Sequence, residues 1–316
     1  MAKHGRGPGA AGRHPLGAAE RRQPGLWIAA LLPGLLLGLL LGGAPARGEP
    51  RLAVFVTLPP QKYFVERIAG ERVEVTVLVP PGADAHTYEP HPRQMAALER
   101  ARLYFAVGDP FEAVWLPKFR AANPRLRVVR TDAGVDKLPS GPEPGAHDPG
   151  RGQAPPDPHI WLSPALVRIQ AGQILEGLTQ ADPAHRDDYA AGYTRFLREL
   201  DALDAELRAL FRDLGAAREF MVFHPAWGYF ARDYGLVQVA IEAQGKSPTP
   251  RRLRELIEHA KERKINVIFA QPQRSAKAAE TIARAIGGRV EIADDLASDW
   301  ADNLLAVAGK VRAALR

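Results

Sequence analysis

Short apolar runs alternate with amphipathic stretches along most of the chain after residue 50. The runs are rich in β-branched and aromatic residues, which is typical of buried strands. They are Leu52–Thr57, Val73–Val79, Leu103–Val107, Leu126–Val129, Phe220–Phe223, Gln238–Ile241, Val267–Phe269 and Arg289–Ile292. The helix-like stretches include Pro92–Ala101, Pro110–Ala122, Pro250–Lys264 and Ser275–Gly287. Strands that alternate with helices form parallel sheets, so the pattern predicts an α/β protein with one parallel-sheet lobe in each half.

The segment between the two halves has the pattern of one long helix. Asp182 is a suitable N-cap, Pro183 suits the first helical turn, and apolar residues then recur every three or four positions as far as Leu214. A helix over 182–214 would be a rod of roughly 48 Å. We expect it to join a lobe formed by 47–181 to a lobe formed by 215–316, and a coiled-coil dimer helix is the alternative.

A second interruption lies within the first half, at residues 138–158. Proline and glycine dominate this segment, which leads directly into Asp157-Pro158-His159. Such a composition cannot build a hydrophobic core, so it predicts a mobile loop.

The N-terminal residues have the three parts of a signal peptide. Basic residues occupy 1–22, a leucine-rich run follows from Leu26 to Leu41, and Ala44-Pro45-Ala46 supplies small residues for cleavage. The run is shorter than the roughly 20 residues of a membrane-spanning helix, so an anchor is the weaker alternative. We expect residues 1–46 to be removed on export to the periplasm. Arg21-Arg22 leaves open whether export is by the Sec or the twin-arginine route.

Composition changes this picture in two ways. The chain has no cysteine, which argues against a lipid-modified cysteine and a disulfide framework. The formal net charge of +6 arises mostly from the predicted leader, since residues 1–46 hold five bases and one acid. The remainder is close to neutral, so the basic pI is no argument for nucleic acid binding.

Three histidines lie where strands and turns should bring side chains to the mouth of a sheet. His224 follows a strand, His86 follows a strand and a Pro80-Pro81-Gly82 turn, and His159 precedes a turn into a helix. Ligands of open parallel sheets bind beyond the carboxyl ends of the strands. Neutral imidazole is the commonest protein ligand for zinc, so these residues indicate a metal site. Asp294 also follows a strand and is a fourth candidate.

The remaining histidines are weaker candidates. His91 lies between two prolines at a helix start, and His185 and His259 lie among charged residues of helices, where we expect them to be solvated.

Several motifs make the chain resemble a known family, the zinc- and manganese-binding substrate-binding proteins of ABC importers, which include the TroA-like and ZnuA-like proteins. The resemblance covers about Leu52 to Arg316. The matching motifs are Gly82–Pro90 with its His-x-Tyr-Glu-Pro, Asp157–Pro164, Phe223–Phe230, Ala270-Gln271-Pro272-Gln273 and the long helix opening Asp182-Pro183.

The resemblance implies two lobes joined by one long rigid helix, with a metal ion held between them. It implies a monomeric periplasmic protein, not an enzyme, that delivers the metal to a membrane permease with its cytoplasmic ATPase. The implied ligands are His86, His159, His224 and Asp294, with Asp295 or water as alternatives at the fourth place. Manganese members usually have glutamate at the position of His224, so Zn²⁺ is favoured over Mn²⁺.

Two other classes of function stay open. A zinc hydrolase would need a general base beside the metal, and Glu89 is the nearest acid to His86 in sequence. A metal-binding adhesin or metal buffer is the other alternative. The 138–158 segment has one histidine, so it is a poor candidate for a metal-scavenging loop.

Overall fold

The computed structural model describes residues 51–85, 87–140, 155–242 and 247–315. The predicted signal peptide, His86 and most of the 138–158 segment lie outside these ranges. Residues 50–316 form one compact unit, which contains two four-stranded parallel sheets. This confirms the predicted α/β class with one parallel-sheet lobe in each half. In the described part of the chain, no helix is long and apolar enough to cross a membrane.

The first lobe has the strand order β2-β1-β3-β4. Its strands are β1 (Leu52–Val56), β2 (Val73–Val77), β3 (Leu103–Ala106) and β4 (Arg127–Arg130). Its helices are α1 (Pro59–Ala69), α2 (Pro92–Leu98) and α3 (Pro110–Ala122). The central strand β3 is buried along its whole length, and its Leu-Tyr-Phe-Ala sequence suits a strand covered on both faces.

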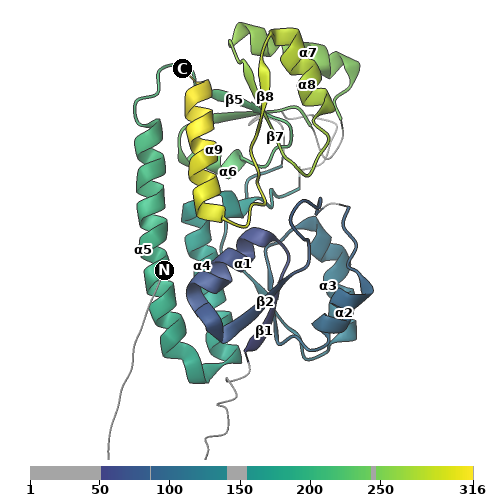
Figure 1. Cartoon of the computed structure of the whole chain (residues 1–316), viewed down its shortest axis with the longest axis vertical. Helices are drawn as coiled ribbons and strands as arrows, with labels where there is room; N and C mark the ends of the chain where they lie inside the picture. Colours follow the sequence, from purple (N-terminus) through teal and green to yellow (C-terminus); the bar gives the residue numbers. More distant parts are fainter. Residues whose placement is uncertain (1–50, 86, 141–154, 243–246, 316) are drawn as a thin grey trace, which may run out of the picture. The chain divides into compact units, whose positions relative to one another are not determined.

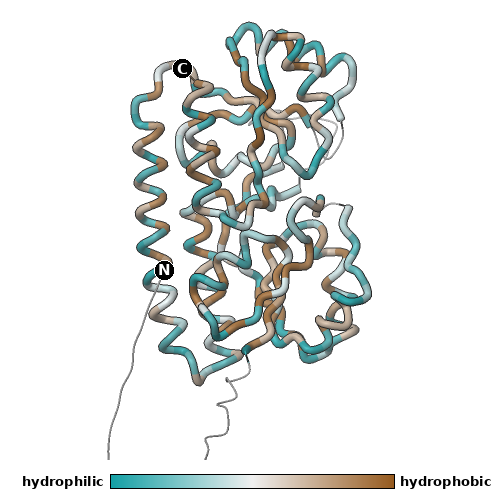
Figure 2. Tube along the Cα trace, viewed as in Figure 1, coloured by the Kyte–Doolittle hydropathy of each residue, from teal (hydrophilic) through white to brown (hydrophobic). Residues whose placement is uncertain are grey.

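The second lobe repeats this arrangement, with the order β6-β5-β7-β8. Its strands are β5 (Glu219–Val222), β6 (Val237–Ala240), β7 (Val267–Ala270) and β8 (Arg289–Ile292). Its helices are α6 (Gly228–Asp233), α7 (Pro250–Glu262) and α8 (Lys277–Ile286). In both lobes the most apolar segments are the inner strands, as the brown parts of the trace in Figure 2 show.

Three longer helices complete the unit: α4 (Pro164–Ala181), α5 (Arg186–Phe211) and α9 (Trp300–Ala314) (Figure 1). The predicted helix over 182–214 is therefore shorter, because a 3-10 turn at Pro183–His185 precedes α5. Asp182 caps the C-terminus of α4 and is not helical. Its carboxylate accepts hydrogen bonds from Tyr189 Oη at 2.6 Å and from His185 Nδ1 at 2.7 Å, which hold the turn.

Helix α5 packs against α1 and α4 near its start and against α9 further along. Phe196 contacts the rings of Tyr63 and Phe64 of the first lobe. Phe211, at the other end, contacts Phe230 and Tyr234 of the second lobe. The helix is thus packed on both lobes, as a rigid connection requires.

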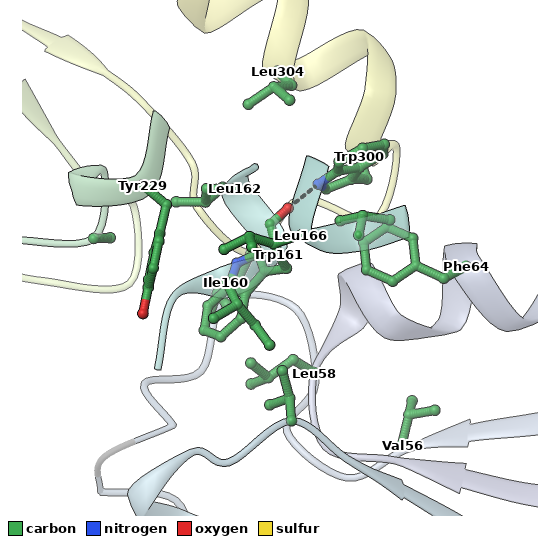
Figure 3. Close-up of a cluster of buried hydrophobic side chains, with 14 of the residues drawn as sticks. Val56, Leu58, Phe64, Ile160, Trp161, Leu162, Leu166, Tyr229, Trp300 and Leu304 are labelled. Atoms are coloured by element: carbon green, nitrogen blue, oxygen red, sulfur yellow. Dashed lines mark hydrogen bonds between the residues drawn. The ribbon is translucent and has the colours of Figure 1, made fainter. Parts of the chain in front are cut away.

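A cluster of buried apolar side chains continues the core between the lobes (Figure 3). Trp161 lies near its centre and is 1% exposed. Its indole Nε1 donates to the carbonyl of Asp295 at 2.7 Å, and its own carbonyl accepts from Trp300 Nε1 at 2.7 Å. These hydrogen bonds fix the segment that carries His159 against the second lobe.

Candidate metal site

A pocket lies beyond the carboxyl ends of the strands in both lobes, where open parallel sheets bind their ligands. Several lining residues follow a strand directly or within a few positions, as Asp109 follows β3 and His224 follows β5. The full lining is Leu58, Asp84, Ala85, Asp109, His159, Trp161, His224, Gln271, Gln273, Arg274, Asp295 and Leu296. Three carboxylates and one guanidinium are among these residues, so the charge of the pocket favours a cation.

His159 lies at the start of a short 3-10 helix, Ile160–Leu162, and is 6% exposed. Asp157 fixes it twice. The Asp157 Oδ1 atom accepts the backbone N–H of His159 at 3.0 Å and lies 2.6 Å from the ring Nδ1. When Nδ1 donates its proton to this carboxylate, Nε2 keeps its lone pair for a metal ion.

His224 is held in the same way from the second lobe. It is 5% exposed, and its Nδ1 lies 3.1 Å from Glu242 Oε2. Glu242 follows β6 and is itself 2% exposed. A carboxylate on the second ring nitrogen is the usual partner of a metal-binding histidine, because it fixes the tautomer and the ring orientation.

The two imidazoles meet in the pocket with their Nε2 atoms facing each other. The distance between His159 Nε2 and His224 Nε2 is 3.2 Å, and the rings are inclined by 76°. Two nitrogens bound to one tetrahedral zinc ion at about 2.0–2.1 Å lie about 3.3–3.4 Å apart. The observed separation therefore fits a shared metal ion with very little adjustment.

At both His159 and Asp295 in the pocket, burial and a neighbouring charge shift the pKa in opposite directions. Burial alone would lower the pKa of His159, but the adjacent Asp157 carboxylate outweighs burial and the pKa is raised. Burial raises the pKa of Asp295 to about 6, an effect that the nearby His159 partly offsets. A divalent cation would stabilise the charged carboxylate and the neutral imidazole together.

The two neighbouring aspartates have different surroundings. Asp295 lines the pocket and is 7% exposed. Asp294 is absent from the lining, and its Oδ1 accepts hydrogen bonds from Gln273 Nε2 at 2.6 Å and from the backbone N–H of Leu296 at 2.9 Å. The described pocket lining thus includes Asp295, the alternative to Asp294, together with the two histidines.

His86 lies outside the described residues, although Asp84 and Ala85 bring its segment to the pocket wall. Within the described ranges, no three histidine or acidic side chains are close enough together to hold a metal ion by themselves. The pocket therefore provides two imidazoles and a carboxylate nearby, and the third imidazole is a prediction from the sequence.

The weaker candidates lie elsewhere. His91 is the N-cap of α2. His185 and His259 each face a carboxylate, Asp182 and Glu219, at 2.7 Å, so neither is simply solvated as expected. Glu89 is exposed and is not among the described residues that line the pocket.

The sequence reasoning missed several polar residues of the site, and Asp157, Glu242, Gln271 and Arg274 are among them. Two of them lay inside motifs that the sequence had already indicated, Asp157-Pro158-His159 and Ala270-Gln271-Pro272-Gln273. Gln271 is 3% exposed and donates from Nε2 to the carbonyl of His224 at 3.3 Å. Glu242 had no local signal, because only the tertiary fold brings it to His224.

Comparison with protein families agrees with this architecture. Residues 54–308 match the family described as zinc-uptake complex component A, periplasmic (ZnuA). The match spans most of the chain, and the protein belongs to this family.

Individual relatives are similar over most of their length. The chain is 29% identical over 264 residues to the high-affinity zinc uptake system protein ZnuA of Bacillus subtilis, covering 81% of each protein. It is 30% identical over 249 residues to a putative metal-binding protein of Treponema pallidum, covering 76% of this chain and 78% of that protein.

Solved structures show the same fold. A crystal structure of ZnuA is 44% identical with a TM-score of 0.79, and the match covers 84% of this chain and 100% of that one. A ZnuA deletion mutant with zinc bound is also 44% identical, with a TM-score of 0.77 and coverage of 84% and 98%.

Proposed function

We propose that this protein captures Zn²⁺ outside the cytoplasm and delivers it to the membrane permease of an ABC importer. The observation that carries the proposal is the 3.2 Å separation of His159 Nε2 and His224 Nε2 in a pocket between the lobes. Each ring is oriented by a carboxylate on its other nitrogen, as metal-binding imidazoles are. Membership of the zinc-uptake family supports the same cargo and the same transport role.

The proposed ligands are the imidazoles of His86, His159 and His224. Asp295 or a water molecule completes a tetrahedral site, and Asp294, which the family resemblance indicates, is the competing carboxylate. Imidazole donors favour zinc over manganese, which prefers carboxylate oxygen. We infer that zinc is cargo and that the protein is no enzyme, and its membership of a zinc-uptake family supports this.

Location and partners follow from the same proposal. We infer that residues 1–46 direct export and are cleaved, so that the protein works as a monomer in the periplasm and does not bind nucleic acid. The permease, with its cytoplasmic ATPase, is the partner to which the two lobes present the loaded pocket. The relative from Bacillus subtilis is named for zinc uptake, and this supports the assignment.

A metal titration tests the proposal. Wild-type protein should bind one Zn²⁺ tightly, in competition with a chromogenic chelator, and should bind Mn²⁺ far more weakly. The variants His86→Ala, His159→Ala and His224→Ala should each lose affinity by more than about 100-fold, which exceeds the usual effect of a residue that only orients a ligand. The control is His259→Ala, which removes a surface histidine paired with Glu219. Unchanged affinity in His159→Ala and His224→Ala would refute the site.

A further inference from the structure

Among the described residues that line the pocket, Arg274 is the one arginine, and it contacts a carboxylate from each lobe. It follows β7 in a turn closed by the hydrogen bond from its own N–H to the carbonyl of Gln271. Its Nη1 donates to Glu242 Oε1 at 3.0 Å and to Oε2 at 3.1 Å. Its Nη2 donates to Asp84 Oδ1 at 3.3 Å.

These contacts are shielded from solvent. The side chains of Glu242, Arg274 and Asp84 are 3%, 14% and 22% exposed. Partly buried ion pairs are screened by salt much less than exposed pairs. Guanidinium also carries its donors in a planar fork, so one arginine can hold two carboxylates in fixed directions, which the single ammonium of lysine cannot do.

The two carboxylates lead to opposite sides of the pocket. Glu242 is the group that orients the Nδ1 of His224 in the second lobe. Asp84 belongs to the first lobe, where the Pro80–Ala83 turn, with Gly82 at a φ of 83°, directs the chain to the pocket wall. A continuous path of polar contacts therefore runs from Asp84 through Arg274 and Glu242 to His224.

We propose that Arg274 is a positioning residue that ties the two lobes across the zinc site and slows the release of zinc. The inference rests on the proposed function. Zinc held by groups from both walls is released more readily when the walls move locally apart, and the contact between Arg274 and Asp84 opposes that movement. The contact with Glu242 acts in addition on His224, by holding the carboxylate that orients the ring.

The two contacts predict different effects for two substitutions. Asp84→Asn weakens the tie between lobes and leaves the pairing of Arg274 with Glu242, so it should raise the rate of zinc dissociation by between about threefold and tenfold. Arg274→Gln removes both contacts, so it should raise that rate further and also weaken equilibrium affinity. Arg274→Lys should lie between the wild type and Arg274→Gln, since an ammonium can replace one contact but not both.

The test is stopped-flow release of zinc from the loaded protein into excess chelator. The set comprises the wild type, Asp84→Asn, Arg274→Gln, Arg274→Lys and the double variant of Asp84→Asn with Arg274→Gln. A matched control is Arg284→Gln, which removes an exposed arginine of α8. Thermal unfolding of each zinc-free variant identifies any loss of fold. Asp84→Asn is a near-isosteric change, so it keeps the test valid if Arg274→Gln proves unstable.

If the tie exists, Asp84→Asn accelerates release in the wild-type background but has no further effect in the Arg274→Gln background. High salt should accelerate release from the wild type much less than Asp84→Asn does, because partly buried ion pairs are weakly screened. Release from Asp84→Asn at the wild-type rate, or additive effects of the two substitutions, overturns the tie while leaving zinc binding intact. A wild-type protein that binds no zinc overturns the proposed function as well.

Discussion

Asp294 and Asp295 are adjacent in sequence, but of the two only Asp295 is among the described residues that line the pocket. Asp294 Oδ1 accepts two hydrogen bonds that hold the turn after β8. Asp295 is buried in the pocket lining, where its pKa is raised to about 6. We therefore propose a structural role for Asp294 and a role for Asp295 as the carboxylate that a cation would stabilise.

The pair of variants Asp294→Asn and Asp295→Asn separates the two roles. We expect Asp295→Asn to lower zinc affinity by about 10-fold or more, because an amide gives a bound cation less stabilisation than a carboxylate. Asp294→Asn should keep the affinity and lower the free energy of unfolding by about 1 kcal/mol, because an amide oxygen accepts the two hydrogen bonds of the turn more weakly than a carboxylate does. Chelator competition and urea unfolding measure the two quantities. The reverse pattern would make Asp294 the ligand.

Glu112 is a second buried carboxyl, behind the wall of the first lobe. It accepts hydrogen bonds from Thr57 Oγ1 and from the backbone N–H groups of Val107 and Gly108, both at 2.8 Å. These bonds hold the chain just before Asp109 of the pocket. Burial raises the pKa of Glu112 from 4.5 to about 7 despite the three donors.

The raised pKa predicts how stability changes with pH. Between about pH 4.5 and 7 the folded protein keeps a proton on Glu112 that the unfolded chain has lost, so the stabilisation is complete at low pH and is lost as pH rises through 7. The free energy of unfolding of the wild type should fall by roughly 3 kcal/mol between pH 4.5 and 8. Glu112→Gln cannot titrate, so this variant should lack that fall. Urea unfolding of zinc-free protein measures it, and the exposed Glu258→Gln is the control. An identical pH profile in the wild type and Glu112→Gln would refute this assignment.

At the scale of residues, the sequence predicted the side chains that strand ends and turns bring to the pocket. It did not predict the side chains that reach the site through contacts between distant segments. His159 and His224 could be proposed because strand ends and turns place them at the mouth of the sheets. Glu242 and Arg274 could not be proposed, because each acts through a residue that is distant along the chain. Glu242 lies 18 residues from His224, and Arg274 lies 32 residues from Glu242. The sequence also left the choice between Asp294 and Asp295 open.

At the scale of elements, every predicted strand is present, because short β-branched runs between turns have one stable role in an α/β lobe. Helices α1, α4, α6 and α9 were not delimited. Helix α4 packs against α1, α5 and the strands β3 and β4, so it is buried on several sides. A helix buried on several sides has apolar residues all around it and lacks the single stripe that marks an amphipathic helix.

Gly192 shows how packing explains a residue that helix propensity disfavours. It lies within α5 where this helix crosses α1, and a Cβ atom there would overlap the carbonyl oxygen of Ile68. Glycine lets the two backbones approach at a position where any side chain would force them apart. The close approach holds α5 against the first lobe.

Two matched glycine substitutions test this packing. Gly192→Ala should destabilise the protein by about 1–3 kcal/mol, because the overlap must be relieved by moving a helix. Gly309→Ala, on an exposed face of α9 with nothing within 4 Å of the new methyl group, should stabilise the protein by up to about 1 kcal/mol. Urea unfolding compares both with the wild type. Stabilisation by Gly192→Ala would show that α5 and α1 are farther apart than the structure places them.

At the scale of the whole folded unit, two features connect the lobes over a broad area. Helix α5 packs on both lobes through aromatic contacts at its two ends, at Phe196 and Phe211. The Trp161 segment is hydrogen-bonded to Asp295 and Trp300 across the buried cluster of Figure 3. A hinge needs a few residues whose backbone is free to turn, and a helix packed along its length does not supply them.

We therefore expect zinc loading to change the solution dimensions of the protein very little. The radius of gyration from small-angle X-ray scattering should be about 18 Å both with and without zinc. This is the value for a compact chain of this size. Replacing the exposed Ala205 and Glu206 of α5 by glycine removes no packed side chain but costs the helix about 1 kcal/mol per position. This double variant should show a larger difference between its zinc-free and loaded states than the wild type. A large decrease in the wild-type radius on loading would contradict the rigid connection and place a hinge elsewhere in the chain.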